Sequence, residues 1–377
     1  MTRIVVTGAG GLLGWHASAR LHAANCAARF QGQAEPYDIV PLDHAAFDNG
    51  ERLSAALAGA DVVLHFAGVN RASEGVDVGE GNPAIATTLA EAYTAAGSQA
   101  TIVYANSTHA AGDSVYGVSE ARAAEILSAV ARNFVNLILP HIFGECARPY
   151  YNNVTATLID QIWAGEPLTI NPEGRVSLLH AGAAAQMAID AGLAGKACDL
   201  TPGGRDIMIG ELAEVLQSFH ADYARNIYPD LTDRFTLDLF NTYRAASYPA
   251  HWPFMLKLNT DPRGVLFEAA KGGGGGQSFV SSTVPGITRG DHFHLEKVER
   301  FMVLSGEAMI RIRRVLDDTV WEFPVTGDRP VAVDMPTLHT HSIENTGSGD
   351  LLTLFWSHDI FDPENPDTYA DAVLRAQ

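Results

Sequence analysis

The chain has 377 residues, which is long for one compact core, so its length predicts two domains. Hydrophobic residues make up 47% and charged residues 18% of it, as in globular proteins, but the formal net charge of -19 argues against nucleic acid or an anionic membrane as a partner, because like charges repel. No signal peptide or long apolar run is visible, so we expect a cytoplasmic protein without a membrane segment.

The first predicted elements are a strand at Arg3–Thr7, a glycine-rich turn, and a helix that extends to about residue 23. Gly8 allows the tight turn, Gly11 lets backbone N–H groups approach a pyrophosphate, and Gly14 lets the helix pack against its strand. The N-terminus of a helix also attracts phosphate. We therefore predict that a dinucleotide binds at Gly8, Gly11, Leu12 and Gly14.

The ends of the next two strands extend the predicted cofactor site. The strand Asp38–Leu42 is followed by Asp43, whose carboxylate can accept a hydrogen bond from a ribose 2′-OH and would repel a 2′-phosphate. This residue favours NAD over NADP. The strand Val62–Phe66 is followed by Ala67 and Gly68, where the backbone would come close to the cofactor.

Further strands are predicted at Thr101–Tyr104 and Val135–Leu139, with helices at Pro83–Ala96 and Val118–Arg132. Strands that alternate with helices indicate a parallel, doubly wound sheet. The first domain is therefore expected to have the α/β Rossmann fold.

Several segments of this domain resemble the extended short-chain dehydrogenase/reductase family. They are Thr7-Gly8-x-x-Gly11-x-x-Gly14, Ala67-Gly68-Val69-Asn70-Arg71, Ser107, Tyr116-Gly117-x-Ser119 and Pro140-x-Ile142-Phe143-Gly144. The resemblance implies that Tyr116 exchanges a proton with the substrate oxygen, that Ser107 orders that oxygen, and that a nicotinamide carries the hydride.

The residue four positions after Tyr116 departs from this family pattern. It is Glu120, where the family has a lysine that lowers the pKa of the tyrosine. Because residues i and i+4 share a helix face, a carboxylate replaces an ammonium beside the phenol and should raise its pKa. Ile138 and the stretch Leu179–Gly182 also replace residues typical of the family. Two interpretations stay open, impaired or altered reductase chemistry and ordinary reduction with a substitute group.

A domain boundary is predicted near residue 247, where the helical stretch Asp238–Tyr248 gives way to Pro249 and Pro253. This divides the chain into an NAD(P)-binding domain, residues 1–247, and a second domain, residues 248–377. Short β-rich segments alternate with turns from residue 277 onward, which is typical of a small antiparallel barrel. The strands are predicted at Phe279–Val284, Arg300–Leu304, Ala308–Arg313, Trp321–Val325 and Leu351–Phe355. The glycine run 272–276 is interpreted as a flexible hairpin tip.

The cupin assignment of the second domain follows from two motifs. G-x5-H-x-H-x4-E-x6-G begins at residue 286 and P-x4-H-x3-N begins at residue 336. His292 and His294 are two residues apart, so both imidazoles point to one face of a strand, and Glu299 shares that face only if a turn or bulge intervenes. With His341, they form a set of three imidazoles and a carboxylate that suits a divalent metal such as zinc or iron. Leu338 stands where the second motif usually has glycine.

Essentially the whole chain resembles one family of bacterial capsular-polysaccharide enzymes, in which a reductase domain is fused to a C-terminal cupin. The resemblance rests on Gly68-Val69-Asn70-Arg71, Arg148-Pro149-Tyr150-Tyr151-Asn152-Asn153, Asp261-x-Arg263-Gly264, Pro285–His292, Ser342–Gly347, Phe361-Asp362-Pro363 and Pro366-Asp367-Thr368-Tyr369. It implies a zinc cupin that epimerises C3 of a UDP-4-keto-6-deoxy-N-acetylhexosamine and a first domain that reduces the C4 ketone with NADPH. It also implies a homodimer.

Other roles and other functions remain open at this point. His339 and Glu296 are candidates for the proton-transferring base, and Arg289 and Lys297 are candidates for binding diphosphate or an oxyanion. The chain could instead be an oxidoreductase of a secondary-metabolite pathway, with NAD bound at Asp43 and iron in the cupin, and metal analysis would separate the two. In a third interpretation, the first domain is a non-catalytic binding or dimerisation scaffold that binds no dinucleotide.

Overall fold

The computed structural model describes residues 1–70, 77–262, 264–272 and 274–375. Arg71 and Arg263, which belong to motifs quoted above, and Gly273 lie outside the described residues. The chain forms two compact units. Unit 1 contains Met1–Thr157 and Asn171–Gly210, and unit 2 contains Leu158–Ile170 and Glu211–Gln377.

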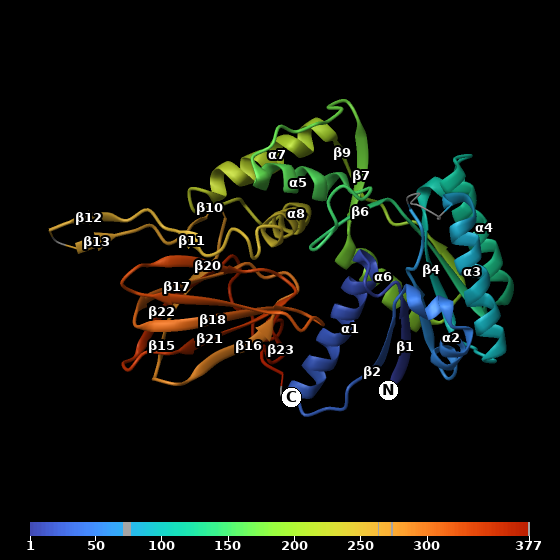
Figure 1. Ribbon diagram of the computed structural model, residues 1–377, viewed down its shortest axis with the longest axis horizontal. Helices are drawn as coiled ribbons and strands as arrows, with labels where there is room; N and C mark the ends of the chain where they lie inside the picture. The colour runs from blue at the N-terminus through green and yellow to red at the C-terminus, as the bar shows by residue number, and fades with distance from the viewer. Residues whose placement is uncertain (71–76, 263, 273, 376–377) are drawn as a thin grey trace. The chain divides into compact units, whose positions relative to one another are not determined.

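Unit 1 is built around a parallel sheet in the order β2-β1-β3-β4-β5-β8 (Figure 1). Its strands are β1 (Thr2–Thr7), β2 (Tyr37–Leu42), β3 (Val62–His65), β4 (Thr101–Ser107), β5 (Asn133–Leu139) and β8 (Cys198–Leu200). One face is covered by α1 (Leu12–Phe30) and α6 (Ala181–Ala194), and the other by α2 (Gly50–Leu57), α3 (Val78–Ala95) and α4 (Val115–Val130). This arrangement confirms the predicted doubly wound α/β fold.

The sheet of unit 1 has an apolar core on each face, as expected for parallel strands buried on both sides. Val5 lies in the core beneath α2, α3 and α4, whereas its neighbours Ile4 and Val6 lie in the core beneath α1 and α6. This alternation follows from the period of two along a strand. A smaller sheet contains β6 (His141–Phe143), β7 (Arg175–His180) and β9 (Arg205–Met208), and two short helical turns are η1 (His44–Asp48) and η2 (Thr108–Ala111).

Two helices of unit 1 begin or end five or more residues from the predicted position. α1 continues to Phe30, beyond the predicted end near residue 23, and its last turns contain Ala27 and Ala28, which favour helix. α3 begins at Val78, ahead of the predicted start at Pro83, because the Asp77 side chain accepts a hydrogen bond from the Gly79 N–H and caps the helix.

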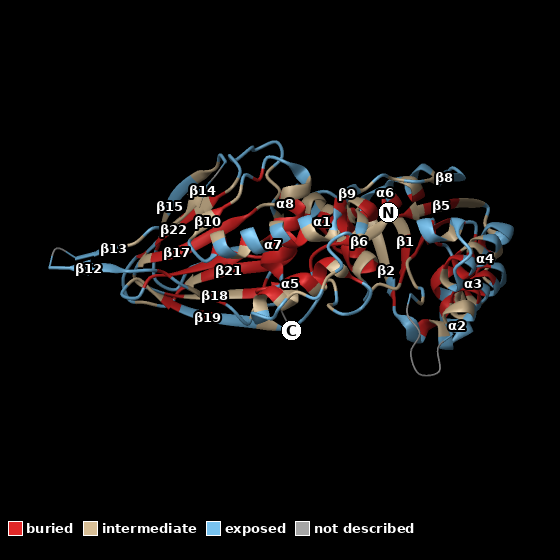
Figure 2. Cartoon of the chain, turned by 90° about the horizontal axis from the view of Figure 1, so that it is seen from above, coloured by how far each residue is buried: buried red, intermediate tan, exposed pale blue. Residues whose placement is uncertain are grey.

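Unit 2 contains an all-β barrel of two five-stranded antiparallel sheets, β11-β20-β17-β22-β15 and β19-β18-β21-β16-β23. Its strands are β11 (Phe254–Met255), β15 (Gln277–Thr283), β16 (Thr288–Phe293), β17 (Glu299–Ser305), β18 (Glu307–Arg314), β19 (Val320–Thr326), β20 (Val331–Met335), β21 (His339–Asn345), β22 (Leu351–Ser357) and β23 (Tyr369–Ala370). Phe301, Ile310 and Ile343 come from both sheets and share one core. Figure 2 shows β17 and β21 as largely buried. These antiparallel sheets confirm the predicted all-β fold of the second domain.

Three helices complete unit 2, namely α7 (Ile209–Tyr223), α8 (Arg234–Ala245) and most of α5 (Val154–Ala164). Arg300 of β17 and Asp334 of β20 form a fully buried ion pair with 2.5 Å between Nε and Oδ1. Tyr223 of α7 donates a hydrogen bond to the same carboxylate, and Arg244 of α8 donates to the Met335 carbonyl oxygen. Residues 211–247 are therefore grouped with the barrel, which differs from the predicted boundary near residue 247.

Among the described residues, the strands on either side of the glycine run, β14 (Lys271–Gly272) and β15, pair with β10 (Ile227–Tyr228) and β22 and not with each other, which contradicts the predicted hairpin tip. The pairing of β14 with β10 is parallel. Gly272 lies against the Trp356 ring, and a Cβ atom there would be 3.7 Å from the indole. The remaining strands of this region are β12 (Asn259–Asp261) and β13 (Gly264–Leu266), which pair with each other.

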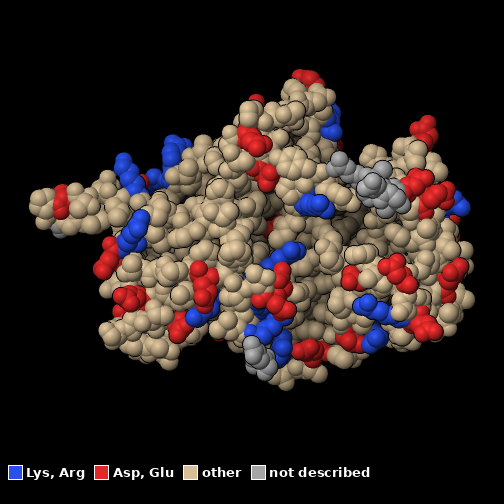
Figure 3. All heavy atoms as spheres, viewed as in Figure 1, with Lys and Arg blue, Asp and Glu red and all other residues tan. Residues whose placement is uncertain are grey.

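The charged surface and the helices can be compared with what the composition predicts about nucleic acid and membranes as partners. On the face seen in Figure 3, Lys and Arg side chains are interspersed with Asp and Glu. Among the described residues, no helix combines the length and the hydropathy that are needed to cross a membrane.

Candidate active sites

The glycine turn of unit 1 brings the predicted cofactor residues together. Gly8 has a φ of 64°, and a Cβ atom on it would lie 2.8 Å from the Ala67 nitrogen. A Cβ atom on Gly14 would lie 2.2 Å from the Gly8 carbonyl oxygen. Gly11 precedes α1 and Leu12 is its first residue. Positions 8 and 14 need glycine because the backbones of the turn, the helix and the end of β3 lie in direct contact there.

The other two predicted cofactor segments lie at the same edge of the sheet. Thr7 pairs with Leu42 and with His65, so Asp43 and the Ala67–Gly68 segment follow neighbouring strands at the end where the glycine turn begins. Asp43 is exposed and precedes η1. The close backbone approach and the free helix N-terminus fit the pyrophosphate of a dinucleotide.

Ser107 and Tyr116 are also brought together in unit 1. Ser107 ends β4 and its side chain accepts a hydrogen bond from the His109 N–H. Tyr116 lies in the first turn of α4, is half-buried, and shares a hydrogen bond with Ser107. The pKa of Tyr116 is raised, first by burial and then by the charge of Glu120. A raised pKa is the effect expected of a carboxylate four residues after the tyrosine.

Glu120 lies in the interior and is held by neutral groups. Its side chain is buried, with a relative exposure of 5%. The Asn82 amide donates to Oε1 at 2.8 Å, and the Tyr104 hydroxyl donates to Oε2 at 3.0 Å. Burial raises the pKa of Glu120 to about 7, although hydrogen bonds with Tyr104 and Tyr116 act in the opposite direction. A carboxyl group with this pKa can exchange protons near neutral pH.

Asn82 and Tyr104 contribute to this site but were not predicted from the sequence. Asn82 binds the loop after β3 through both halves of its amide, since Oδ1 accepts from the Val69 N–H at 2.6 Å and Nδ2 donates to the Val69 oxygen at 3.1 Å. Tyr104 is a strand residue whose ring stacks on His65 at 5.6 Å between centroids. Two features of the sequence could have indicated these residues. Asn82 is a polar residue directly before Pro83, and Tyr104 places a hydroxyl group at the predicted end of a buried strand.

In unit 2, the four predicted metal ligands converge. One ligand atom from each of His292, His294, Glu299 and His341 lies within 4.8 Å of the others. His292 is in β16, His294 follows that strand, Glu299 begins β17 and His341 is in β21. The turn between β16 and β17 provides the change of direction that Glu299 requires, and a register shift occurs between Gly290 and His292.

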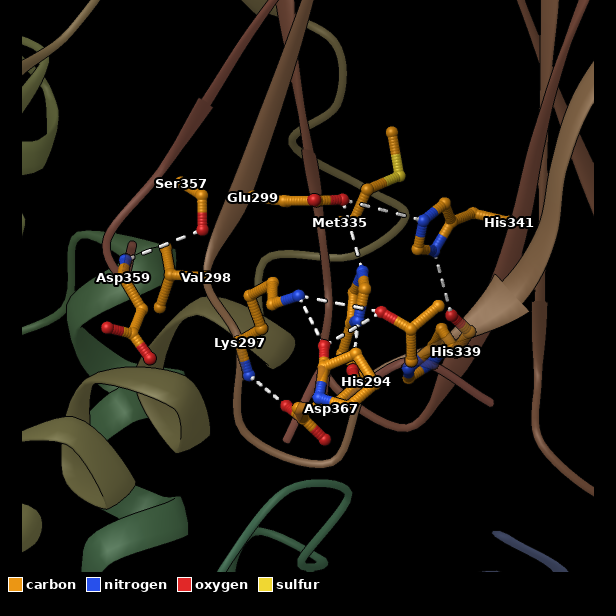
Figure 4. Close-up of polar contacts among 12 residues, drawn as sticks. His294, Lys297, Val298, Glu299, Met335, His339, His341, Ser357, Asp359 and Asp367 are labelled. Carbon is orange, nitrogen blue, oxygen red and sulfur yellow. Dashed lines mark hydrogen bonds and ion pairs between the residues drawn. The ribbon is translucent and has the colours of Figure 1, made fainter. Parts of the chain in front are cut away.

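Within this cluster of three histidines and Glu299, the side chains point toward a common centre, as metal ligands do. His294 Nε2 lies 3.1 Å and His341 Nε2 lies 3.8 Å from Glu299 Oε2, and Figure 4 shows both rings turned toward the carboxylate. His341 Nε2 is buried and has no hydrogen-bond partner. Burial alone would raise the pKa of Glu299, but the charge and hydrogen bond of His294 outweigh it, so the pKa falls to about 2. Burial and the neighbouring His294 lower the pKa of His292 to about 4.

Backbone carbonyl groups orient two of these imidazoles. His294 Nδ1 is 2.5 Å from the Asp367 oxygen, and His341 Nδ1 is 3.2 Å from the His339 oxygen. A ring that donates from Nδ1 presents Nε2 to a metal, which is the usual arrangement around bound zinc. The orphaned His341 nitrogen, the lowered pKa values of the His292 and His341 imidazoles and the ionised carboxylate together fit a divalent cation.

Asp367 is a further residue that the sequence argument quoted only as part of a family motif. Its carboxylate accepts hydrogen bonds from the backbone N–H groups of Leu295, Glu296 and Lys297 at 2.8–2.9 Å. The Lys297 ammonium group donates to the Pro366 oxygen at 2.6 Å. Asp367 therefore fixes the turn that carries His294.

The candidates for proton transfer and anion binding are placed as follows. His339 is buried, and its Nδ1 lies 2.9 Å from the Thr337 oxygen. The Glu296 carboxylate accepts from Arg234 at 2.5 Å. Arg289 Nε donates to Thr283 at 2.9 Å, and the hydrogen bond from Lys297 to Pro366 occupies that ammonium group. None of these contacts selects the base.

Comparisons with known proteins agree with this two-part organisation. Residues 4–191 match the NAD dependent epimerase/dehydratase family, and residues 259–369 match the polysaccharide biosynthesis C-terminal domain. A UDP-2-acetamido-2,6-beta-L-arabino-hexul-4-ose reductase of Pseudomonas aeruginosa is 28% identical over 379 residues, which cover 98% of this chain and 99% of the relative.

Two solved structures resemble the chain over nearly its whole length. The capsular polysaccharide assembling protein CapF of Staphylococcus aureus is 28% identical, with a TM-score of 0.59 and coverage of 99% of this chain and 100% of that chain. A structure of CapF with the inhibitor 3-isopropenyl-tropolone is also 28% identical, with a TM-score of 0.57 and the same coverage of 99% and 100%.

Proposed function

Since this chain belongs to the family that joins an NAD dependent epimerase/dehydratase domain to a polysaccharide biosynthesis C-terminal domain, we propose that it converts a UDP-linked 4-keto-6-deoxy-N-acetylhexosamine. It is an NAD(P)-dependent enzyme of nucleotide-sugar metabolism. The reaction has two parts, epimerisation at C3 in unit 2 and reduction of the C4 ketone in unit 1. The observation that carries the proposal is the convergence of His292, His294, Glu299 and His341 in the barrel.

Unit 2 is the part to which we assign epimerisation. A divalent metal, for which zinc suits the ligands, would supply Lewis-acid stabilisation to the oxygen of the enolate that forms when the proton beside a ketone is removed. His341 offers a buried nitrogen that has no hydrogen-bond partner, and Glu299 brings the negative charge that offsets part of the charge of the cation. The Asp367 contacts hold His294 in place, so the ligands need little reorganisation on binding.

Unit 1 is the part to which we assign reduction. The glycine turn would hold the dinucleotide, which supplies the hydride, and Tyr116 with Ser107 would face the carbonyl oxygen. Glu120 replaces the lysine that makes this tyrosine a better acid, and its charge acts in the opposite direction. We therefore propose that reduction is slow relative to epimerisation at neutral and higher pH. Asp43 supports NAD, whereas the family resemblance supports NADPH.

The test is mass spectrometry of the product formed from a UDP-4-keto-6-deoxy-N-acetylhexosamine in D2O, with zinc, NADH and NADPH present. We expect one solvent deuterium to enter at C3, because the proton that returns to the enolate comes from exchangeable groups. The entry of deuterium should not require either dinucleotide. A substrate that stays unlabelled in the presence of metal-loaded protein would refute this substrate class.

The matched variants separate the two units. His292→Ala removes one ligand, so it should release zinc and abolish deuterium uptake, whereas a variant that keeps both would refute the metal site. Tyr116→Phe should leave deuterium uptake unchanged and remove reduction, since the phenol belongs to unit 1. A homodimer, which the family resemblance implies, stays a prediction that light scattering checks.

A further inference from the structure

Glu120 is a buried carboxyl group that has neutral partners only. Asn82 and Tyr104 each bind one of its oxygens, and Tyr116 also hydrogen-bonds to it. Among the described residues, no lysine or arginine pairs with it. An isolated carboxylate is costly to bury, because neutral dipoles replace only part of its hydration. The surroundings of Glu120 therefore favour the protonated form of its carboxyl group more than water favours that of a surface carboxyl group.

The hydrogen bonds around Glu120 limit where its proton can go. The Asn82 amide is oriented by its contacts with Val69, so it presents its NH2 group to the carboxyl, and an amide NH2 cannot accept a proton. The remaining neighbours are the hydroxyls of Tyr104 and Tyr116. Tyr104 donates to Oε2 and stacks on His65 in the interior, whereas Tyr116 is half-buried at the start of α4.

We propose that the protonated Glu120 carboxyl donates its proton to Tyr116 during ketone reduction, so that a carboxyl group takes the place of the usual ammonium. The proposal rests on the reductase function assigned to unit 1. The carbonyl carbon accepts the hydride of the reduced nicotinamide, and the π electrons of the C=O bond move to oxygen. That oxygen takes the phenolic proton of Tyr116, and Tyr116 takes the proton of Glu120. The resulting carboxylate regains a proton from water, and the nicotinamide leaves oxidised.

The two protonation states of Glu120 act in opposite directions on this step. A neutral carboxyl group donates to the phenol oxygen and stabilises the developing phenolate, whereas an ionised carboxylate repels it. The value of about 7 for the Glu120 pKa places this change near neutrality. Reduction should therefore fall about tenfold for each pH unit above that pKa. A lysine in this position would favour phenolate at the same pH.

Other titratable groups near Glu120 have to be separated from it. His65 of β3 stacks on Tyr104, but burial lowers its pKa to about 3, so it stays neutral over this range. His109 of η2 lies with its ring centroid 6.1 Å from that of Tyr116. The phenols of Tyr104 and Tyr116 both have raised pKa values, first because of burial and then because of Glu120, so they do not ionise near neutrality. His109→Gln is the control that removes the remaining histidine.

The first experiment needs no substrate. The carbonyl stretch of a protonated carboxylic acid is followed by infrared difference spectroscopy of the full-length protein between about pH 6 and pH 9. We expect a band that disappears on titration and that is missing in Glu120→Gln. Tyr104→Phe removes a donor to the carboxylate, so it should move the titration upward by about one pH unit. Absence of a Glu120-dependent band at the acidic end would overturn the proposal.

The second experiment measures kcat for reduction of the same keto sugar across this pH range. The wild-type protein should lose activity as pH rises, and His109→Gln should retain that dependence. Glu120→Gln should lower kcat at least tenfold at the acidic end with little change in KM, and Glu120→Lys should remove the alkaline decline. Wild-type kcat and pH dependence in Glu120→Gln would overturn the proposal. Deuterium uptake without reduction at any pH would also overturn it, whereas loss of both reactions in the wild-type protein would refute the proposed function itself.

Discussion

Leu338 adopts a backbone conformation that side chains rarely take. Its φ is 61°, at the position where the cupin pattern usually has glycine, and its side chain is buried. Its N–H donates to the His294 oxygen at 2.8 Å, and its oxygen accepts from the Val315 N–H at 3.0 Å. The left-handed region costs about 1–2 kcal/mol for a residue with a Cβ atom. Here the hydrogen bonds and the buried leucine offset that strain.

A pair of substitutions separates backbone strain from packing at residue 338. Leu338→Ala and Leu338→Gly both remove the buried side chain, but only glycine relieves the strain. Leu338→Gly should therefore be more stable than Leu338→Ala by about 1 kcal/mol, which reverses the ordinary order of these residues. Urea unfolding of the two full-length variants measures the difference. Equal or opposite stabilities would show that position 338 carries no strain.

At the scale of elements, the segment 362–370 supports the proposed metal site from the side of the C-terminus. β23 pairs with β16 at His292 and Phe293, and the Asp367 carboxylate accepts three backbone hydrogen bonds from the turn after His294. Two ligands are thus fixed by one segment. The arrangement explains how a turn between two strands can hold an imidazole in a defined orientation.

Removal of the Asp367 carboxylate should weaken metal binding without removing a ligand. In Asp367→Ala, three backbone N–H groups lose their acceptor, so we expect the zinc Kd to rise about 10–100-fold. Titration of the metal-free protein against a coloured chelator measures it. Asp362→Ala is the matched control, because this exposed carboxylate only accepts from Glu364 and Asn365 in its own turn. An unchanged Kd in Asp367→Ala would contradict the supporting role.

The sequence predicted the elements that have a local period or a fixed spacing. The glycine turn and the cluster of the four proposed metal ligands could be predicted because Gly8, Gly14 and the histidines occupy positions that geometry restricts. The contacts of Asn82 and Asp367 were not predicted, because Asn82 binds a residue 13 positions away and Asp367 binds one 72 positions away. The start of α3 was missed because Pro83 usually marks the first turn, whereas Asp77 caps this helix five residues earlier than predicted.

At the scale of the whole molecule, the division between the units does not follow the chain order. Residues 158–170 and 211–247 belong to the unit of the barrel, although the sequence argument placed them in the first domain. Trp163 stacks on Tyr243 at 5.1 Å between centroids, and Tyr223 binds the Arg300–Asp334 pair. The amphipathic stretch Asp238–Tyr248 predicted a helix, most of which lies in α8, but it did not predict the surface that α8 covers.

Two fragments test which residues the barrel requires. Residues 211–377 retain α7 and α8 apart from the first two residues of α7, whereas residues 248–377 lack Tyr223 and Arg244 and leave the buried Arg300–Asp334 pair without its covering groups. We expect the longer fragment to be more stable by several kcal/mol, as is typical when partners of a buried ion pair are removed. Urea unfolding and binding of an apolar dye compare them. Equal stability would place the boundary at residue 247.

The interleaving of the two units has a consequence for synthesis of the chain. The ribosome releases residues 158–170 before residues 171–210 complete unit 1, yet the partners of that early segment in unit 2 are made later. The glycine turn can therefore form while the chain is still growing, whereas the proposed metal site has to wait for His341 and Asp367. Nascent chains arrested after about residue 230 should protect the first site from protease and leave residues 158–170 open to cleavage.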